Sequence, residues 1–368
     1  MYSQNDLDEA VASGAVSAES ANALRAFIDQ QRETPAVDEE QFRLITGFND
    51  IFVSIAAAIL LFAVGFIGQT VGESLGFVID GNGPSPLAPL AIAGVAWALA
   101  LFFTAKRRMA LPSILLLLAF VGGTFAAVGF ALAIGVGDPP SDQEGIYAGA
   151  VAAISGAVAA AAAWVHWKRF RVPITVAAGA LAATAIAAGL LIAVLGNLDG
   201  ANGDIMLGFV LLLGVGVFLF AMRWDSSDPA RVTRRSDVAF WLHLLAAPMI
   251  VHPIFTLLGL NDGNATIGEG LVVILLYVAM GIAALAIDRR ALLVSALAYV
   301  LFALNELFRE FGAVQLNVAL TALVIGSALL LLSAFWHQAR AMVVRPLPES
   351  LKARLPLIDR KVAIAPAA

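Results

Sequence analysis

The chain has 368 residues, of which 60% are hydrophobic and 13% are charged, and its formal net charge is −5. Water-soluble domains are about 45–50% apolar and about 25% charged, so this composition excludes an ordinary soluble domain and predicts a membrane protein. The sequence contains no cysteine, which excludes disulfide bonds, thiolate metal sites and cysteine nucleophiles.

The first 48 residues predict a small cytoplasmic helical hairpin ahead of the membrane region. Gly14 suits the C-terminus of a first helix, Ser17 suits the N-cap of a second helix, and Glu19 lies in its first turn. Such a hairpin is too small to bury a sizeable core by itself. We therefore expect residues 1–48 to form a separate domain, available to a cytoplasmic protein partner.

About ten hydrophobic segments follow, each roughly 20 residues long, the length at which an α-helix crosses about 30 Å of hydrocarbon. A spanning helix satisfies its own backbone hydrogen bonds, so residues 49–337 are expected to form an all-α, polytopic membrane helix bundle. The fourth and fifth segments are rich in glycine and alanine, which predicts close helix packing. The segments are approximately residues 49–68, 87–104, 111–136, 146–164, 172–195, 205–222, 238–259, 267–287, 291–308 and 313–336.

Basic residues in the connecting loops predict the orientation of the chain. Alternate loops carry basic clusters, at residues 106–108, 168–171, 223–235 and 289–290. The other loops are acidic, and their only basic residue is Arg309. Basic loops face the cytoplasm, so both termini, including the tail 338–368, are expected there, with the lipid bilayer as the main partner. No basic patch with interleaved aromatic residues indicates a nucleic-acid partner.

One hydrophobic segment, residues 237–255, holds two histidines and two prolines. His243 and His252 are nine positions apart. At about 100° per residue they lie on opposite faces of a straight helix and cannot share a metal ion. His243, near the cytoplasmic end beside Trp241, is interpreted as an interfacial or structural residue that snorkels or forms a hydrogen bond. Pro248 lies between the histidines and is a candidate kink.

His252 lies deeper, roughly 21 Å from the cytoplasmic end at about 1.5 Å per residue. Pro253 follows it and removes one helical hydrogen bond, which frees a backbone carbonyl. Two interpretations stay open. His252 is either a structural residue beside the freed carbonyl or a member of a proton pathway.

A polar stripe on the ninth segment supplies candidate partners at a similar depth. Tyr299 and Glu306 share a helical face, and Asn305 and Arg309 adjoin it. The hypothesis is a polar pathway with His252 in the outer half of the bilayer, where Glu306 titrates or attracts a cation and Arg309 is its counter-ion. The alternative is a solvated Glu306–Arg309 pair at the external end of a helix.

The chain lacks the common catalytic motifs: it has no P-loop, no His-Glu-x-x-His and no Gly-x-Ser-x-Gly. We therefore predict that it is not an enzyme and has no catalytic residue, cofactor or metal site. His166, between Trp164 and Trp167 and next to Lys168, is interpreted as an interfacial anchor. Binding of an anionic lipid headgroup is the alternative interpretation.

The N-terminal hairpin LDEAVASGAVSAESANALRAFI, followed by a many-span bundle, resembles bacterial families of predicted integral membrane proteins of unknown function. The matching turn runs from Gly14 to Ser17, and residues 240–255 are similar to a recurrent stretch in alphaproteobacterial members. This resemblance implies a bacterial inner-membrane location and supplies no activity.

Together these features predict an integral inner-membrane protein that acts as a secondary transporter of a small solute or ion. Ten spans could divide into five plus five, and an odd number of spans in each half gives an inverted repeat. The alternative is a non-transporting scaffold or sensor whose residues 1–48 bind a cytoplasmic partner. A lipid-modifying enzyme is disfavoured because few polar residues lie within the hydrophobic segments.

Overall fold

In the computed structural model, part of the chain is described in detail. The described residues are 10–31, 48–196, 200–229, 231, 233–259, 267–290, 292–293, 297, 300–301, 317–352 and 355–356. They form helices and turns, with no strand among them, so the predicted all-α class is confirmed. The chain divides into two compact units, Met1–Arg43 and Leu44–Ala368. The predicted domain limits at residues 48 and 337 stay predictions.

The first unit contains helix α2 (Ala18–Gln31). Gly14 has a left-handed φ of 74°, which suits glycine because it has no Cβ. The Ser17 hydroxyl accepts a hydrogen bond of 3.1 Å from the backbone N–H of Ser20, which satisfies one of the free donors of the first turn. The predicted helix break at Gly14 and N-cap at Ser17 are therefore confirmed.

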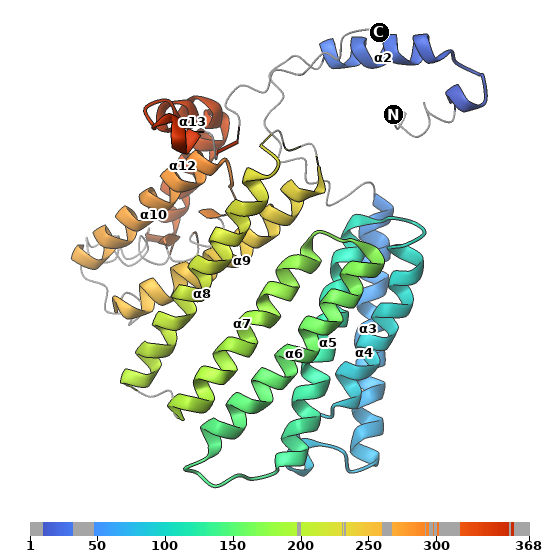
Figure 1. The fold of residues 1–368 in the computed structure, drawn as a ribbon, viewed down its shortest axis with the longest axis vertical. Helices are drawn as coiled ribbons and strands as arrows, with labels where there is room; N and C mark the ends of the chain where they lie inside the picture. Colours follow the sequence, from blue (N-terminus) through green and yellow to red (C-terminus); the bar gives the residue numbers. More distant parts are fainter. Residues whose placement is uncertain are drawn as a thin grey trace. The chain divides into compact units, whose positions relative to one another are not determined.

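The second unit begins with seven long helices that follow one another along the chain (Figure 1). They are α3 (Phe48–Ser74), α4 (Leu87–Phe103), α5 (Ala110–Val136), α6 (Glu144–Phe170), α7 (Ile174–Leu195), α8 (Ala201–Ser226) and α9 (Arg234–Leu257). The short 3-10 helix η1 (Ile79–Gly81) lies between α3 and α4. The later helices are α10 (Ile267–Ile287), α12 (Asn317–Ala334), α13 (Trp336–Val344) and α14 (Glu349–Lys352).

Six of these helices, α3 and α5 to α9, are long and apolar enough to cross a membrane, and the chain is therefore a multi-pass membrane protein. Helix α4 has 17 residues, which extend over roughly 25 Å at about 1.5 Å per residue. Helix α10 contains a shorter apolar stretch, Ile274–Ile287. The predicted count of about ten spans is not confirmed, and most of the ninth predicted span lies outside the described residues.

The predicted last span, residues 313–336, ends within two residues of the end of helix α12. Helix α12 ends at Ala334, and α13 leaves it at an angle of 76°. The break is at Phe335, whose backbone is non-helical with φ −110° and ψ 22°. The apolar run ends close to this break, because His337, Gln338 and Arg340 follow Trp336.

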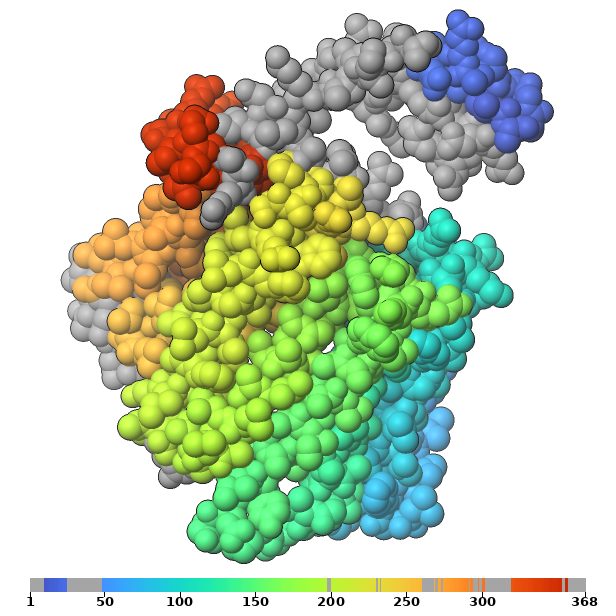
Figure 2. Space-filling model, in the orientation of Figure 1, coloured from blue at the N-terminus to red at the C-terminus, as the bar shows by residue number. Residues whose placement is uncertain are grey.

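Helices α6 and α7 pack with their backbones in close contact. A Cβ atom added at Gly189 of α7 would lie 2.6 Å from the backbone nitrogen of Ala153 and from the carbonyl oxygen of Gly149, both in α6. Only glycine fits at this distance, so the predicted close packing of the small-residue segments is confirmed. Consecutive helices from α3 to α9 also lie side by side on the face shown in Figure 2, where the colours pass from cyan through green to yellow.

Helices α8 and α9 form another closely packed pair. A Cβ atom at Gly214 of α8 would lie 2.9 Å from the backbone of Met249 in α9. This contact brings the C-terminal end of α8 beside the first half of α9. Polar residues occupy both of these ends, which positions them for the site described next.

Candidate functional site

Three ionisable side chains meet inside the bundle at the C-terminal end of α8. Asp225 of α8 is 2% exposed, His243 of α9 is 0% exposed and Arg289, directly after α10, is 1% exposed. His243 Nε2 and Asp225 Oδ2 are 2.9 Å apart. Arg289 donates from Nε to Asp225 Oδ2 at 3.2 Å and from Nη2 to Asp225 Oδ1. We call these three residues, with Ser236, the Asp225 cluster.

Ser236, in the first turn of α9, completes the contacts of Arg289. Arg289 Nη2 donates to the Ser236 carbonyl at 3.1 Å and to its hydroxyl at 3.2 Å. A buried guanidinium is stable only where its charge and its donors are satisfied, and Asp225 and Ser236 provide both. The bidentate pair with Asp225 fixes the end of α8 against the segment after α10.

His243 differs from Arg289 in how fully its polar atoms are satisfied. Its Nδ1 atom is buried and has no hydrogen-bond partner among the described residues. The Phe218 ring lies edge-on at 5.3 Å from the imidazole. Asp225 Oδ2 therefore accepts two hydrogen bonds, one from His243 Nε2 and one from Arg289 Nε. Among the described residues, His243 is thus held by one hydrogen bond, whereas Arg289 forms four.

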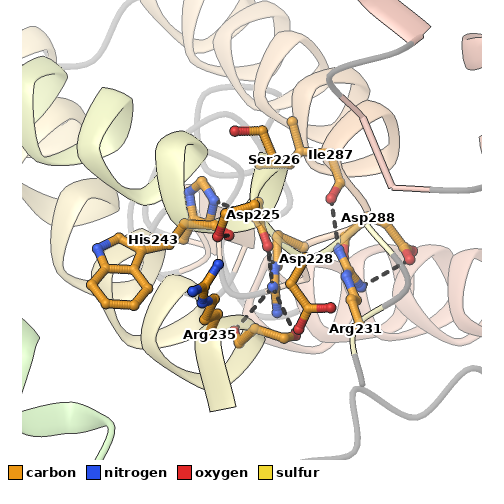
Figure 3. Close-up of polar contacts among 12 residues, drawn as sticks. Asp225, Ser226, Asp228, Arg231, Arg235, His243, Ile287 and Asp288 are labelled. Atoms are coloured by element: carbon orange, nitrogen blue, oxygen red, sulfur yellow. Dashed lines mark hydrogen bonds and ion pairs between the residues drawn. The ribbon is translucent and has the colours of Figure 1, made fainter. Parts of the chain in front are cut away.

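A second set of buried charges lies directly beside the first. Asp288 Oδ2 accepts from Arg231 Nη1 at 2.9 Å, and Asp288 Oδ1 accepts from Trp336 Nε1 at 2.7 Å. Arg231 Nη2 also donates to the carbonyls of Ile287 at 2.9 Å and Asp288 at 2.8 Å. Figure 3 shows Arg231 directed at these groups and His243 directed at Asp225. We call Asp288, Arg231, Trp336 and Arg340 the Asp288 cluster.

The Asp288 cluster connects Arg231, which lies between α8 and α9, with α13 and with the segment after α14. Arg340 Nε lies 3.8 Å from Asp288 Oδ1, and Arg340 Nη2 donates to the carbonyl of Pro356 at 2.6 Å. Asp288 and Arg289 are adjacent in the chain, so the two clusters share one backbone segment. Movement of that segment would alter both clusters together.

His166 lies inside a separate, largely aromatic pocket. It is 0% exposed, and its Nδ1 atom is 3.2 Å from the hydroxyl of Thr175 in α7. The rings of Trp97, Phe120 and Phe170 surround it at 6.2, 6.0 and 4.6 Å between centroids. The structure thus places His166 within the packed helix ends, which differs from the predicted interfacial anchor. The reason is that α6 continues to Phe170 and turns this residue toward α7.

The predicted polar pathway is described only in part. His252 is exposed on α9, and Tyr299, Asn305, Glu306 and Arg309 lie outside the described residues. The structure therefore neither brings these residues together nor separates them.

The other residues singled out in residues 237–255 have different environments. Trp241 is partly buried and packs between two apolar clusters, Pro248 is exposed and Pro253 is buried. His243 lies in the Asp225 cluster, whose other members the sequence analysis did not single out. One signal could have found it, because Ser236 and His243 are seven positions apart and share a helical face.

Among the described residues, no group of three His, Asp or Glu side chains is arranged to hold a metal ion. No protein-family model, curated protein or solved structure matches the chain. The chemistry of its side chains is therefore the basis for inferring what it does.

Proposed function

We propose that this multi-pass membrane protein is a secondary transporter of a small solute or ion, in which the Asp225 cluster couples transport to proton movement. The observation that supports this proposal is the buried contact of Asp225 with both His243 and Arg289. Ionisable residues within spanning helices are rare, and in membrane proteins they often mark ion and proton pathways. Histidine is the side chain that most readily changes charge near neutral pH.

The coupling follows from the sharing of one carboxylate by two partners. When His243 is neutral, the charges of Asp225 and Arg289 balance. When His243 binds a proton, it competes with Arg289 for Asp225, because two cations then share one anion in a medium of low dielectric. Helix α9 carries His243 and the segment after α10 carries Arg289, so a change in pairing shifts one element relative to the other.

The proposed solute pathway keeps the residues inferred from the sequence. It comprises His252 with Tyr299, Asn305, Glu306 and Arg309, of which His252 is described. His243 and His252 are both in α9, so one helix would transmit the change in proton binding to the solute. We further propose a bacterial inner membrane with both termini in the cytoplasm, because the basic loops favour that orientation.

The test begins with metabolite profiling of a deletion strain complemented with the wild-type gene. This identifies the solute that accumulates or is lost, without assuming its class. Transport of that solute is then measured in proteoliposomes with an imposed pH gradient. We expect His243→Gln to abolish the response to the gradient, whereas His337→Gln, an exposed histidine of α13, keeps it.

The double variant Asp225→Asn/Arg289→Met removes both charges of the buried pair. Replacing both partners of a buried ion pair is often near neutral for stability, so this protein is expected to fold. Loss of proton coupling in the folded double variant would support the proposal. Wild-type coupling in both this variant and His243→Gln would refute it.

A second candidate, a scaffold or sensor, is supported by the separate compact unit Met1–Arg43. Deletion of residues 1–43 distinguishes the two functions. A transporter is expected to keep its metabolite profile after this deletion, whereas a scaffold is expected to show the profile of the deletion strain.

A further inference from the structure

A cleft of about 830 Å³ opens where the ends of α6, α8 and α9 meet. Four arginines line it together with two tryptophans and smaller side chains. The arginines are Arg171, Arg223, Arg234 and Arg235, and the tryptophans are Trp167 and Trp224. We call this cleft the arginine cleft.

The positive charge of the arginine cleft is not neutralised by its own lining, which contains no carboxylate. Arg171, Arg223, Arg234 and Arg235 are exposed, and none of them forms an ion pair within the part of the chain that the structure describes.

Three carboxylates are next to the lining in the chain, and two of them have other partners. Asp225 adjoins two lining residues, yet its carboxylate binds His243 and Arg289. Asp228 accepts from the backbone N–H and the hydroxyl of Thr233, at 2.9 and 2.7 Å. The third, Asp237, is half-buried and interacts with Arg234. Four arginines against this one carboxylate leave the cleft with a net positive potential that favours an anion.

Two of the arginines stand where a cation is locally unfavourable. Arg234 and Arg235 form the first turn of α9, whose N-cap is Thr233. The N-terminus of a helix carries partial positive charge, and it favours Asp, Glu or a bound anion over Arg. Asp237 in the same first turn offsets part of this charge, and a bound anion would offset the rest.

The aromatic side chains give the cleft an apolar wall. The Arg171 guanidinium lies 5.7 Å from the centre of the Trp167 ring, and the rings of Phe220 and Trp224 are 6.2 Å apart. Tryptophan is typical of the membrane interface, where one edge of the ring is apolar and the other is wet. Leu212 and Leu219 are exposed on the same helix as Phe220 and continue an apolar surface away from the cleft.

We infer that the arginine cleft binds a phosphate-bearing anion at the level of the membrane interface. Arginine is suited to this ligand because its planar guanidinium donates two parallel hydrogen bonds to phosphate oxygens. The phosphate can belong to the headgroup of an anionic phospholipid or to a soluble phosphate ester. This inference goes beyond the proposed transport and does not depend on it, since none of the lining residues belongs to the Asp225 cluster.

The test measures binding to the purified full-length protein in detergent by native mass spectrometry. The probes are phosphatidylglycerol, the zwitterionic phosphatidylcholine and soluble glycerol 3-phosphate. The cleft variant is Arg223→Gln/Arg234→Gln/Arg235→Gln. The matched control, Lys106→Gln/Arg107→Gln/Arg108→Gln, removes three exposed cations from another basic loop.

The wild-type protein is expected to prefer phosphatidylglycerol or glycerol 3-phosphate over phosphatidylcholine. The cleft variant is expected to lose about 100-fold in affinity for the preferred probe, because each of the three cations contributes about fivefold near a charged interface. The control should keep the wild-type affinity. Preference for the lipid alone identifies a headgroup, and binding of both anionic probes identifies the phosphate itself.

Two outcomes would overturn the inference. One is an absence of any preference for the anionic probes in the wild-type protein. The other is an equal loss in the cleft variant and the control, which would show a general effect of basic loops. If the triple cleft variant does not fold, the single variants Arg223→Gln and Arg234→Gln replace it, with an expected loss of about fivefold each. Wild-type affinity in both would refute a specific site.

Discussion

Two regions of this membrane protein are held together in different ways. Helices α3 to α7 pack through small residues, as in the contact of Gly189 with Gly149 and Ala153. Helices α8, α9, α10 and α13 meet at one end through buried charges, which include Asp225, Arg289 and Asp288. Close backbone contact depends on the shape of the side chains, whereas a buried ion pair depends on both partners being present. The two regions should therefore respond to different kinds of substitution.

The largest effect is expected from Arg289→Met. It leaves Asp225 buried with His243 as its remaining partner in the cluster, and breaking one side of a buried ion pair costs about 3–5 kcal/mol. Thermal unfolding in detergent measures this loss. Adding Asp225→Asn to Arg289→Met should restore most of the stability. If the double variant is as unstable as the single variant, charge pairing is not what holds this region.

A smaller loss is expected from Trp336→Phe. The indole N–H donates to the buried Asp288 carboxylate at 2.7 Å, and phenylalanine removes the donor while it keeps an aromatic ring. A hydrogen bond to a charged group contributes about 1.5–3 kcal/mol. The free energy of unfolding should fall by about this amount, and the unfolding temperature in detergent should fall with it. Trp164→Phe, at an exposed position of α6, is the control and should have little effect.

Gly189→Ala tests the small-residue region. The added Cβ would lie 2.6 Å from backbone atoms of α6, which forces the two helices apart and costs about 1–3 kcal/mol. Gly179→Ala is the matched control in the same helix, because its Cβ would meet only the Ala163 Cβ at 3.7 Å. Equal stability of the two variants would contradict the proposed backbone contact between α6 and α7.

The smallest effect is expected from Thr175→Val. It removes the hydroxyl that lies 3.2 Å from His166 Nδ1 and keeps the shape of the side chain. Loss of one buried hydrogen bond costs about 0.5–1.5 kcal/mol. Because the aromatic rings around His166 remain, the bundle should unfold in one transition at a slightly lower temperature. A loss as large as that of Arg289→Met would erase the contrast between the two regions.

The sequence predicted the membrane class and several local features well. Hydrophobic segments of about the length of a bilayer identified the helices, because length and apolar content are local properties. Ser17 and Gly14 were recognised for the same reason, since capping depends on neighbouring residues. The small-residue packing of α6 and α7 was also visible, because glycine and alanine have few other reasons to be so frequent in a span.

The charge clusters were not predicted because they depend on contacts between distant residues. Asp225 and Arg289 are 64 positions apart, and each lies at the end of an apolar segment. At such a position a charged residue is normally assigned to a solvated loop. Helix α8 instead continues to Ser226 and carries Asp225 into the protein. His166 was misplaced in the same way, because α6 extends beyond its hydrophobic segment.

The order in which the Asp225 cluster is assembled has a consequence for biosynthesis. A ribosome adds about 5–20 residues per second, so Arg289 follows Asp225 by roughly 3–13 s. During that interval α8 and α9 are made while the main counter-charge of Asp225 is not. A nascent chain that stops before residue 289 would keep an incompletely paired carboxylate among apolar helices, and membrane quality control would have a chemical mark by which to recognise it.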